Sequence, residues 1–414
     1  MIPIYIYTNH GVFELQGKEE DTIGKTLKDA GIPLSAVSTY QTKKPKPTSS
    51  ISSSDLHFIG SNTRLKDIIK QKKGIQVVAQ LSRNIALSSF LTENNPTFRK
   101  IDNPTAEWIF PDKDKGAFQK NLVQVSSQEC LNFVVESVKE VLKKWPEKSK
   151  PKMVVGVSGG GDSNVLLTAL IKSGLINLKD IYPVMMLGIP DQERVKNQAE
   201  KMCSDLNLEI EFIESNQVAR IIGVSSFSKL REEFVKNYPN TDLEFLGTFL
   251  IRHTLSYYAK LRKTKYVALG LNREDLLSSA LIRVARGRKP LPMPFRKIGP
   301  ITFVYPIWKV PKKIGDGAYP HFSLVNYESR DPSYSEGRCL YYYISYMLSE
   351  IAPGLDISLL EGFSRLASKD DESITLEKEL NDFLCKDDFT PVQLKKWKNF
   401  LNKVKKNIIK TSEL

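Results

Sequence analysis

The chain has 414 residues, enough for two or three domains, and its 41% hydrophobic content argues against a wholly disordered protein. Sixty Lys and Arg residues against 47 Asp and Glu residues give a net charge of +13. This excess favours a polyanionic partner, above all nucleic acid, although lysine-rich surfaces that serve only solubility would give the same charge.

The four cysteines are far apart, form no CxxC pair and are not grouped with the four histidines. We therefore expect no zinc site, no iron–sulfur cluster and no disulfide framework. Cys203 falls at a core spacing within a predicted helix, and Cys339 falls nearer the predicted cleft; a structural role is favoured for both. The other two are Cys130 and Cys385.

No targeting or membrane segment is evident. The first residues, MIPIYIYTNHG, have no basic region and too short an apolar run for a signal peptide. No apolar stretch approaches the length of a membrane span. We therefore predict a cytoplasmic protein without membrane association.

Residues 1–90 have the pattern of a small α+β domain. Strand-like runs at 2–8 and 11–17 are joined by Asn9-His10-Gly11, a hairpin signal, and a helix is predicted at 22–32. Two more runs, at 36–41 and 75–82, read as strands, and the Pro/Ser/Lys-rich stretch 43–55 reads as a loop. This order favours a β-grasp domain.

Residues 91–150 are predicted to form a connector and a helix. The part up to residue 125 is rich in turn signals. A helix then follows at 126–145, with Ser126 or Ser127 as its N-cap. Its predicted buried stripe is Leu131, Val134, Val138, Val141, Leu142 and Trp145.

In residues 151–310 strands and helices alternate. Apolar strand-like runs are found at 153–158, 181–189, 208–215, 265–271 and 303–308. Helical patterns lie between them at 163–174, 192–207, 245–264 and 274–287. This alternation predicts an α/β fold with a parallel, Rossmann-like sheet that has helices on both faces, and a ligand site at the carboxyl ends of its strands.

Residues 311–414 are predicted to form a helical C-terminal extension. One helix is expected at 335–354 and an amphipathic basic helix at 393–410. The apolar stripe of the terminal helix is Leu394, Trp397, Leu401, Val404 and Ile408, and most of its lysines lie off this stripe. Such lysines could contact a nucleic-acid backbone or could merely be solvated.

The segment VVGVSGGGDSNVLL contains the strongest functional signal. A strand that ends in glycines before a helix can bind phosphate, because glycine lets backbone N–H groups turn towards the ligand and the helix start adds a positive dipole. The sequence matches neither GxxxxGK[ST] nor GxGxxG. A carboxylate beside phosphates is repulsive without a cation, so Asp162 indicates Mg²⁺. The simpler alternative is a tight turn with a capping Asp.

SGGGDS in this setting resembles the PP-loop, SGGxDS, of the N-type ATP pyrophosphatases. The resemblance covers residues 150–365 and is strongest to the branch of tRNA 2-thiocytidine and tRNA(Ile)-lysidine synthetases. It implies a HUP-type fold and an enzyme that cleaves ATP between the α and β phosphates. Such enzymes adenylate a substrate, release pyrophosphate, and then let a nucleophile displace AMP.

Further segments carry the finer resemblance. Arg252, within IRHTLSYYAKLRKTKYVALG, falls on the family's arginine, and Gly270 and Asp275 match the first and last residues of GHHxDD. YPIWKVPKKI and DPSYSEGRCLYYYISYMLSEIAPG are similar to the family's later segments. The remaining positions of GHHxDD depart from the family, with Leu271, Asn272 and Glu274 in place of two His and one Asp.

Two other departures limit what the resemblance implies. The paired CxxC motifs that hold the cluster in thiocytidine enzymes are absent, and Gly161 occupies a position that is commonly Lys. The terminal tRNA-binding domains of the lysidine enzymes are not evident. The resemblance therefore supports adenylation but not cluster-dependent thiolation.

The predicted roles follow from what ATP requires. Asp162 and Asp275 are the predicted metal ligands, and Arg252 would stabilise charge on the phosphates. The predicted catalytic residues are Asp162, Ser163, Arg252 and Asp275. The predicted ATP-binding residues are Ser158, Gly159, Gly160, Gly161, Asp162, Ser163, Met186, Leu187 and Gly270, with adenine at the strand end 186–188. Each has a plainer alternative: a core strand for 186–188, a helix-capping carboxylate for Asp275 and a solvated side chain for Arg252.

The stretch 283–297 has six basic residues and follows the helix that Asp275 opens. It is predicted to lie near the cleft and neutralise substrate phosphates, with a solvated loop as the alternative. These residues are Arg283, Arg286, Arg288, Lys289, Arg296 and Lys297.

Three functions remain open from the sequence. The first is a tRNA-modifying enzyme in which ATP and Mg²⁺ adenylate a base. The second is an adenylating enzyme whose substrate is a small molecule or a protein partner docked through the N-terminal domain. The third is an ATP-binding regulator without turnover.

Overall fold

The structure is a computed structural model, and it describes the chain in twelve segments. They are residues 1–8, 11–32, 37–42, 57–71, 76–81, 97–112, 116–188, 195–238, 243–319, 336–351, 354–367 and 391–409. The predicted loop 43–55 and Cys385 lie outside them.

The chain divides into two compact units. The first comprises Met1–Phe98, Ile109–Leu122 and Glu350–Pro353. The second comprises Arg99–Trp108, Val123–Ser349 and Gly354–Leu414. Each has its own buried cluster of apolar side chains, and each is described by itself.

The first unit contains a five-stranded sheet of order β2-β1-β5-β3-β4, in which β1 is antiparallel to β2 and parallel to β5. This is the strand order of a β-grasp domain, as predicted. Alternation along β1 places Ile2, Ile4 and Ile6 on one face, where they are buried with Ile23 and Leu27 of α1. The elements are β1 (Ile2–Thr8), β2 (Gly11–Gly17), α1 (Ile23–Asp29), β3 (Val37–Thr42), β4 (His57–Phe58), α2 (Leu65–Gln71) and β5 (Gln76–Leu81).

The turn-rich stretch after residue 90 contains three strands that its sequence did not predict. They form a sheet of order β6-β8-β7, namely β6 (Thr97–Arg99), β7 (Ala106–Asp112) and β8 (Gly116–Val125). The helix α4 (Ser127–Lys143) follows where predicted. Ser126 is its N-cap, and a capping box with Glu129 satisfies the backbone N–H groups of both residues.

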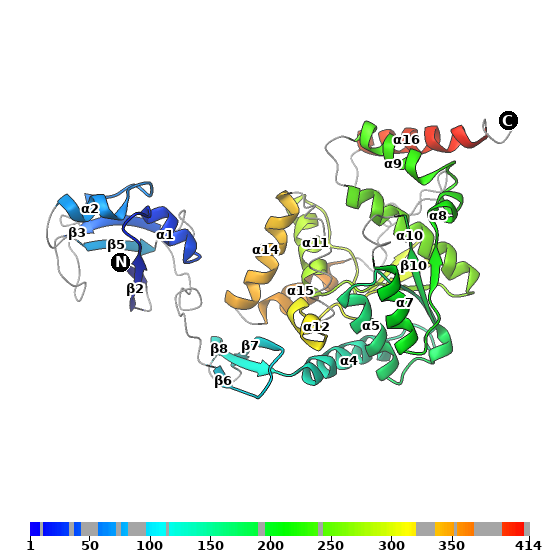
Figure 1. The fold of residues 1–414 in the computed structure, drawn as a ribbon, viewed down its shortest axis with the longest axis horizontal. Coiled ribbons are helices and arrows are strands. Elements are labelled where there is room, and N and C mark those ends of the chain that lie inside the picture. The colour runs from blue at the N-terminus through cyan, green and yellow to red at the C-terminus, as the bar shows by residue number, and fades with distance from the viewer. Residues whose placement is uncertain are drawn as a thin grey trace. The chain divides into compact units, whose positions relative to one another are not determined.

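A six-stranded sheet forms the centre of the second unit and confirms the predicted α/β, Rossmann-like fold (Figure 1). Its order is β11-β10-β9-β12-β14-β13, and all its strands are parallel except β13. The strands are β9 (Met153–Gly156), β10 (Ile181–Met186), β11 (Glu211–Ile213), β12 (Tyr266–Ala268), β13 (Phe295–Ile298) and β14 (Ile301–Val304).

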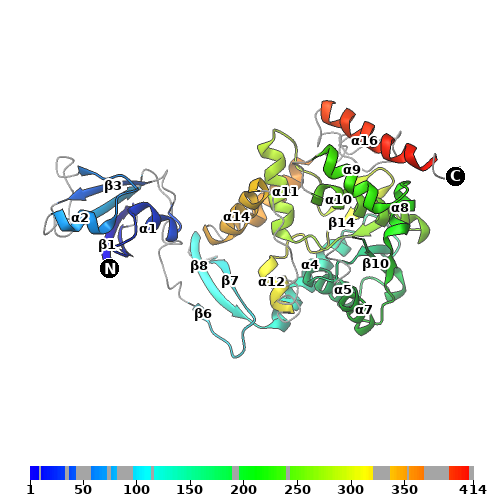
Figure 2. The same ribbon diagram turned by 45° about the horizontal axis from the view of Figure 1, so that its top comes forward.

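The order of the strands reverses between β9 and β12. From β9 the chain steps to β10 and β11 on one side, and it then crosses back to β12 on the other. Right-handed crossovers place the connecting helices of the two halves on opposite faces, as Figure 2 shows. A ligand crevice is expected where the order reverses, at the carboxyl ends of β9 and β12.

The helices of this unit cover the sheet and extend beyond it. Besides α4, they are α5 (Gly161–Lys172), α7 (Lys196–Asp205), α8 (Ser215–Ile222), α9 (Phe227–Asn237), α10 (Leu243–Leu261), α11 (Arg273–Ala285), α12 (Lys312–Ala318), α14 (Glu336–Ile351), α15 (Leu355–Leu366) and α16 (Pro391–Ile409), with a 3₁₀ turn at Leu178–Asp180. None of the described helices combines the length and apolarity needed to span a membrane.

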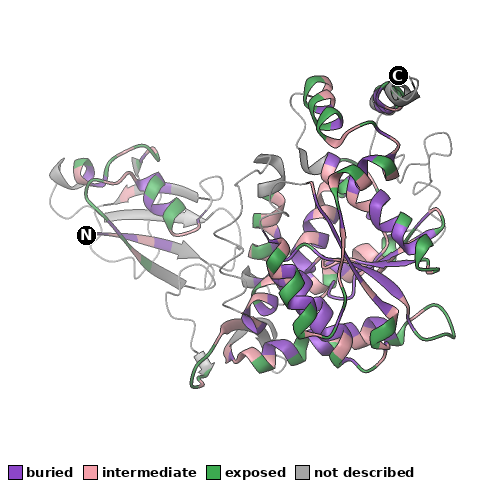
Figure 3. Cartoon of the chain, turned by 45° about the vertical axis from the view of Figure 1, so that its right-hand side comes forward, coloured by how far each residue is buried: buried purple, intermediate pink, exposed green. Residues whose placement is uncertain are grey.

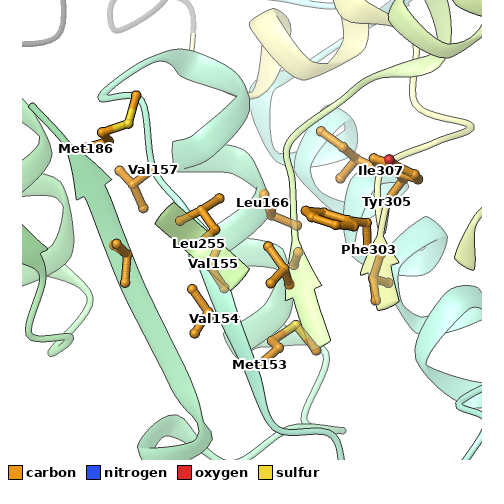
Figure 4. Close-up of a cluster of buried hydrophobic side chains, with 14 of the residues drawn as sticks. Met153, Val154, Val155, Val157, Leu166, Met186, Leu255, Phe303, Tyr305 and Ile307 are labelled. Carbon is orange, nitrogen blue, oxygen red and sulfur yellow. The ribbon is translucent and has the colours of Figure 1, made fainter. Parts of the chain in front are cut away.

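The core of this unit surrounds β9. Met153, Val154 and Val155 are fully buried, and they lie beside Leu166 of α5 and Leu255 of α10 in Figure 4. A strand buried on both faces explains the continuous apolar run in the sequence. Figure 3 shows the same pattern along the whole sheet, with buried strands inside and exposed residues on the outer faces of the helices. The strand that precedes the glycine loop is therefore held rigidly.

The C-terminal extension is anchored to the second unit by buried contacts. Arg273 of α11 is 2.8 Å from Asp356 of α15, and both side chains are almost completely buried. Trp397 of α16 is also fully buried and packs against Phe234 and Phe249. Helices α15 and α16 thus complete the core that contains the sheet.

Candidate active site

The glycine loop joins the end of β9 to the start of α5 at the point where the strand order reverses. Gly159 has a φ of +71°, which L side chains rarely adopt. A Cβ at this position would lie 3.0 Å from the carbonyl oxygen of Val195 and 2.9 Å from its Cγ2 atom. Only glycine fits there, and the loop presents backbone rather than side chains.

The first turn of α5 has the features of an anion-binding site. Its N-cap, Gly160, provides no side-chain hydrogen bond to the first N–H groups of the helix. Ser163 Oγ accepts a hydrogen bond from the Ser158 N–H group at 3.0 Å and lies 3.0 Å from Ser158 Oγ. This contact closes the loop, and the uncapped N–H groups and helix dipole favour a phosphate at the N-terminus of α5.

Asp162 lies at this helix start and forms an ion pair with Lys312 of α12. The Lys312 Nζ atom is 3.0 Å from Asp162 Oδ1 and 2.9 Å from Asp316 Oδ1. Burial raises the pKa of Asp162, as do the nearby charges of Asp275 and Asp316, while Lys312 opposes the rise. Burial alone would lower the pKa of Lys312, but its attraction to the two carboxylates raises it, so the ammonium stays charged.

Asp275 lies in the first turn of α11 and caps it. Its Oδ2 accepts the backbone N–H of Asn272 at 3.1 Å, and Asn272 Oδ1 accepts the Asp275 N–H. The hydroxyl of Tyr342, from α14, donates to Asp275 Oδ1 at 2.8 Å. Burial raises the pKa of Asp275, and the Tyr342 hydrogen bond opposes the rise. This geometry is the capping alternative considered from the sequence, and the metal role of Asp275 stays a prediction.

Glu274, which replaces the first Asp of the family pattern, positions Lys312. Its Oε2 accepts the backbone N–H of Lys312 at 2.8 Å, and its Oε1 is 3.1 Å from Arg273. Arg273 also lies above the ring of Trp108, 4.8 Å from the centroid. Since Glu274 and Arg273 are both 2% exposed, this buried network fixes the start of α12 against α11.

Gly270 brings the two sides of the crevice together. It follows β12, and a Cβ placed on it would lie 3.2 Å from the carbonyl oxygen of Asp162. The structure therefore gathers Gly270, Asp162 and Asp275 at the carboxyl ends of β9 and β12, as the sequence predicted.

The strand end 186–188, predicted to hold adenine, lies at the end of the neighbouring strand β10. Met186 and Leu187 are buried, and the Leu187 N–H group already donates to the Ile213 carbonyl at 2.7 Å. Gly188 has a φ of +95° and packs against Ser215. The adenine role stays a prediction, and it would need backbone groups other than the Leu187 N–H.

Arg252 is half-buried on α10. Two residues later, the Thr254 hydroxyl donates to Met186 Sδ at 3.6 Å, which places this turn of α10 beside the end of β10. Among the described hydrogen bonds and ion pairs, none joins Arg252 to Asp162. Its role at the phosphates stays a prediction.

The basic stretch 283–297 does not form one exposed loop. Arg283 and Arg296 are both 5% exposed; Arg283 donates to the Lys289 carbonyl, and Arg296 lies 4.8 Å above the Tyr305 ring. These positions favour structural roles for both. Arg286, Lys289 and Lys297 are exposed and Arg288 is half-buried, and Arg286 lies eleven residues along α11 from Asp275, about 16 Å.

The cysteines in the described residues lie in helices. Cys130 of α4 and Cys203 of α7 are buried free thiols, and burial raises the pKa of Cys203 to about 12. A buried thiol with a raised pKa is a poor nucleophile, which agrees with the structural role predicted for Cys203. Cys339 lies in α14, and its predicted structural role is not tested.

The residues present fit ATP with Mg²⁺. The uncapped helix start and the glycine that tolerates no Cβ suit phosphate oxygens. Within the described residues no three His, Cys, Asp or Glu side chains form a metal-binding group, but Mg²⁺ is commonly held by one or two carboxylates together with substrate phosphates. Asp162, with 22% of its side chain exposed, could supply such a ligand.

Sequence reasoning missed Lys312, Asp316 and Tyr342. The segment YPIWKVPKKI was noted for its resemblance, but its spacing does not reveal that the first lysine after Pro311 reaches Asp162, 150 residues earlier. The pair of lysines next to a proline was the only local signal.

No protein-family model matches the chain, and no curated protein matches it. Among solved structures, the U34-tRNA thiolase NcsA from Methanococcus maripaludis, with its 4Fe-4S cluster, aligns at 17% identity and a TM-score of 0.46, over 59% of this chain and 81% of that one. The NH3-dependent NAD synthetase from Campylobacter jejuni aligns at 22% identity and a TM-score of 0.33, over 58% and 94%. The NMN synthetase from Francisella tularensis aligns at 16% and 0.33, over 68% and 94%.

These three alignments are likenesses of structure. With TM-scores below 0.5 and identities below 25%, they establish neither the family of this chain nor its activity.

Proposed function

We propose that the protein is a Mg²⁺-dependent ATP pyrophosphatase that adenylates a base of tRNA, releasing pyrophosphate and then AMP. The observation that carries the proposal is the position of the Asp162–Lys312 pair. It lies at the uncapped start of α5, beside Gly270, at the carboxyl ends of the strands where the sheet order reverses.

The chemistry assigns a role to each of these groups. A substrate oxygen attacks the α-phosphorus of ATP, the bond from that phosphorus to the α,β-bridging oxygen breaks, and pyrophosphate leaves. Lys312 would offset the negative charge that develops on the leaving pyrophosphate. Asp162 would hold Mg²⁺ against the phosphates, and the N–H groups of the loop and of the first turn of α5 would bind their oxygens. An amine or sulfur nucleophile then displaces AMP.

Two observations support tRNA as the substrate. The chain carries a net charge of +13, and Arg286, Lys289 and Lys297 are exposed in the second unit. Basic side chains gain affinity for nucleic acid by releasing the counterions of its phosphates. The N-terminal β-grasp domain keeps the second candidate function open, an adenylating enzyme whose small-molecule or protein substrate docks through that domain. The third candidate function, ATP binding without turnover, is distinguished from the other two by whether pyrophosphate is released in the assay below.

The test is release of pyrophosphate and AMP from ATP with Mg²⁺, with and without bulk tRNA, in the wild type, Asp162→Asn and Asp205→Asn. Asp205 is an exposed aspartate at the end of α7, so its variant is a matched control. The proposal expects release that tRNA stimulates, that Asp162→Asn abolishes and that Asp205→Asn preserves.

Other outcomes select between the alternatives. Release that tRNA leaves unchanged would favour a small-molecule or protein substrate. ATP binding without release would favour a regulator, and formation of ADP and phosphate would contradict the proposed chemistry.

A further inference from the structure

We propose that a groove between α9 and α16 binds the phosphate backbone of the RNA substrate. This inference rests on the proposed function, which names tRNA. The groove has a volume of about 340 Å³ and is open to solvent. Its walls include Asn237, Lys395, Lys396, Asn399, Phe400 and Lys403.

The charge of the two helices that form the groove is strongly positive. Helix α16 has six lysines and no acidic residue, and α9 has three basic and two acidic residues. In the groove, Lys403 lies 3.0 Å from Glu233, and Lys396 lies 4.5 Å above the centroid of the Tyr238 ring. Lys395 and Lys396 are exposed. One carboxylate thus faces three ammonium groups, so the groove attracts an anion.

The lysines are held in place by a rigid support. Trp397, Phe400 and Leu401 are buried, and Trp397 packs edge-on against Phe234 of α9 and Phe249 of α10. This anchors α16 and holds Lys396 beside the Tyr238 ring and Lys403 beside Glu233. A charged row on an ordered helix loses less conformational freedom on binding than the same lysines on a flexible tail.

The same packing argues for RNA rather than a lipid surface as the occupant. A helix that binds a membrane inserts its apolar face between the lipids. The apolar face of α16 packs against the second unit, where Trp397, Leu401 and Val404 are buried, so these side chains cannot insert into a membrane. The exposed residues around the groove are Lys395, Lys396, Asn399 and Lys403, whose groups contact phosphate and sugar oxygens, together with one apolar side chain, Val392.

The groove is connected to the candidate active site through α9. A Cβ on Gly188, at the end of β10, would lie 3.8 Å from the ring of Phe227, the first residue of α9. The groove residue Asn237 is ten residues further along, about 15 Å. Helices α9 and α16 lie side by side (Figure 1). A tRNA whose reacting base occupied the crevice could therefore place flanking phosphates in the groove.

The experiment measures tRNA binding by the full chain as a function of salt concentration, for the wild type and for Lys395→Gln/Lys396→Gln. The control is Lys172→Gln/Lys179→Gln, which removes two exposed lysines. Lys172 ends α5 and Lys179 lies in the turn before β10, so both are near the amino ends of the strands, away from the crevice. Loss of two phosphate contacts should weaken binding and reduce the slope of log affinity against log salt by about 2. The control variant should keep the wild-type slope, and both should unfold at the wild-type temperature.

The inference is wrong if the groove variant binds tRNA with the wild-type salt slope, if both variants weaken binding equally, or if the wild type binds anionic phosphatidylserine vesicles but not tRNA. Pyrophosphate release from ATP is measured on the same samples. If the wild type releases no pyrophosphate but the groove variant still loses tRNA affinity, the proposed function fails while the binding surface stands.

Discussion

The ammonium of Lys312 lies 3.0 Å from the carboxylate of Asp162, although the two residues are 150 positions apart. Only 14% of the Lys312 side chain and 22% of the Asp162 side chain are exposed, so solvent screens the pair weakly. The pair joins the glycine loop to α12 across the crevice where the sheet order reverses.

Replacing Lys312 with Met should remove the positive charge opposite the phosphates. Pyrophosphate release should fall by about 10²- to 10³-fold, the usual effect of deleting one preorganised electrostatic group. Lys313→Met, which changes the exposed neighbouring lysine, is the matched control and should keep wild-type rates. Rates from single turnovers with bound ATP would show the effect, and equal rates in the two variants would contradict the role of Lys312.

Substituting Ala for Gly159 or for Gly174 should have different effects on stability and on ATP binding, although the two glycines have similar backbone conformations. Gly159 and Gly174 have φ values of +71° and +69°, but a Cβ at Gly174 meets nothing within 4 Å. Both changes should cost the left-handed strain of about 1–2 kcal/mol in unfolding free energy. Gly159→Ala should cost more because of the Val195 contact, and it alone should lose ATP binding. Urea unfolding and nucleotide titration measure the two effects, and equal losses in both variants would count against the close approach of Val195 to the loop.

Breaking the buried pair between Arg273 and Asp356 should destabilise the protein strongly. Arg273→Met leaves Asp356 buried without its cation, which typically costs about 3–5 kcal/mol in unfolding free energy. Arg262→Gln breaks the pair with Glu211, whose members are 45% and 37% exposed, and should cost at most about 1 kcal/mol. Comparable losses in denaturant unfolding would mean that the extension is not anchored through Arg273.

The capping carboxylate Glu129 should make stability depend on pH. Its hydrogen bonds to Ser126, and then to Arg99, lower its pKa from 4.5 to about 2. A lowered pKa in the folded state stabilises the protein above pH 4.5, and this contribution is lost as the pH falls towards 2. Because the side chain is 36% exposed, we expect a loss of about 1 kcal/mol for Glu129→Gln at neutral pH.

The check is unfolding free energy measured from neutral to acid pH. The difference between Glu129→Gln and the wild type should shrink between pH 4.5 and 2. Glu136→Gln, on the exposed side of the same helix, is the control and should differ less from the wild type. A difference that stays constant over this range would rule out the capping carboxylate as its source.

Local patterns predicted the elements whose residues interact mainly with neighbours in sequence. Ser126, one of the two predicted N-caps of α4, caps the helix, and the apolar stripe of α4 has the helical period, so both were predicted from the sequence. The glycine loop was predictable for the same reason, because its conformation needs glycine whatever surrounds it. Alternating β-branched strands and helices sufficed for the parallel sheet.

Features that depend on distant partners were not predictable. Arg296 was predicted to contact substrate phosphates, with a solvated loop as the alternative, because five other basic residues lie within the same stretch. It is instead buried above Tyr305 in an edge strand. An aspartate at the position of Asp275 has the same sequence pattern whether it binds a metal or caps a helix. Tyr342, whose hydroxyl donates a hydrogen bond to Asp275, comes from another helix. Lys312 has no local pattern that points to Asp162.

The pairing of β9 with β12 joins Val154 to Val267 and sets the order in which the molecule can mature during synthesis. The described apolar cluster and the five strands of the β-grasp domain lie within residues 2–81, so this domain can form early on the ribosome. The crevice cannot form early, because β12, which forms its other side, is made more than a hundred residues after the glycine loop. Lys312 follows later still. An incomplete chain therefore carries the glycine loop without the groups that oppose it, and competence for ATP should appear in one step, late in translation.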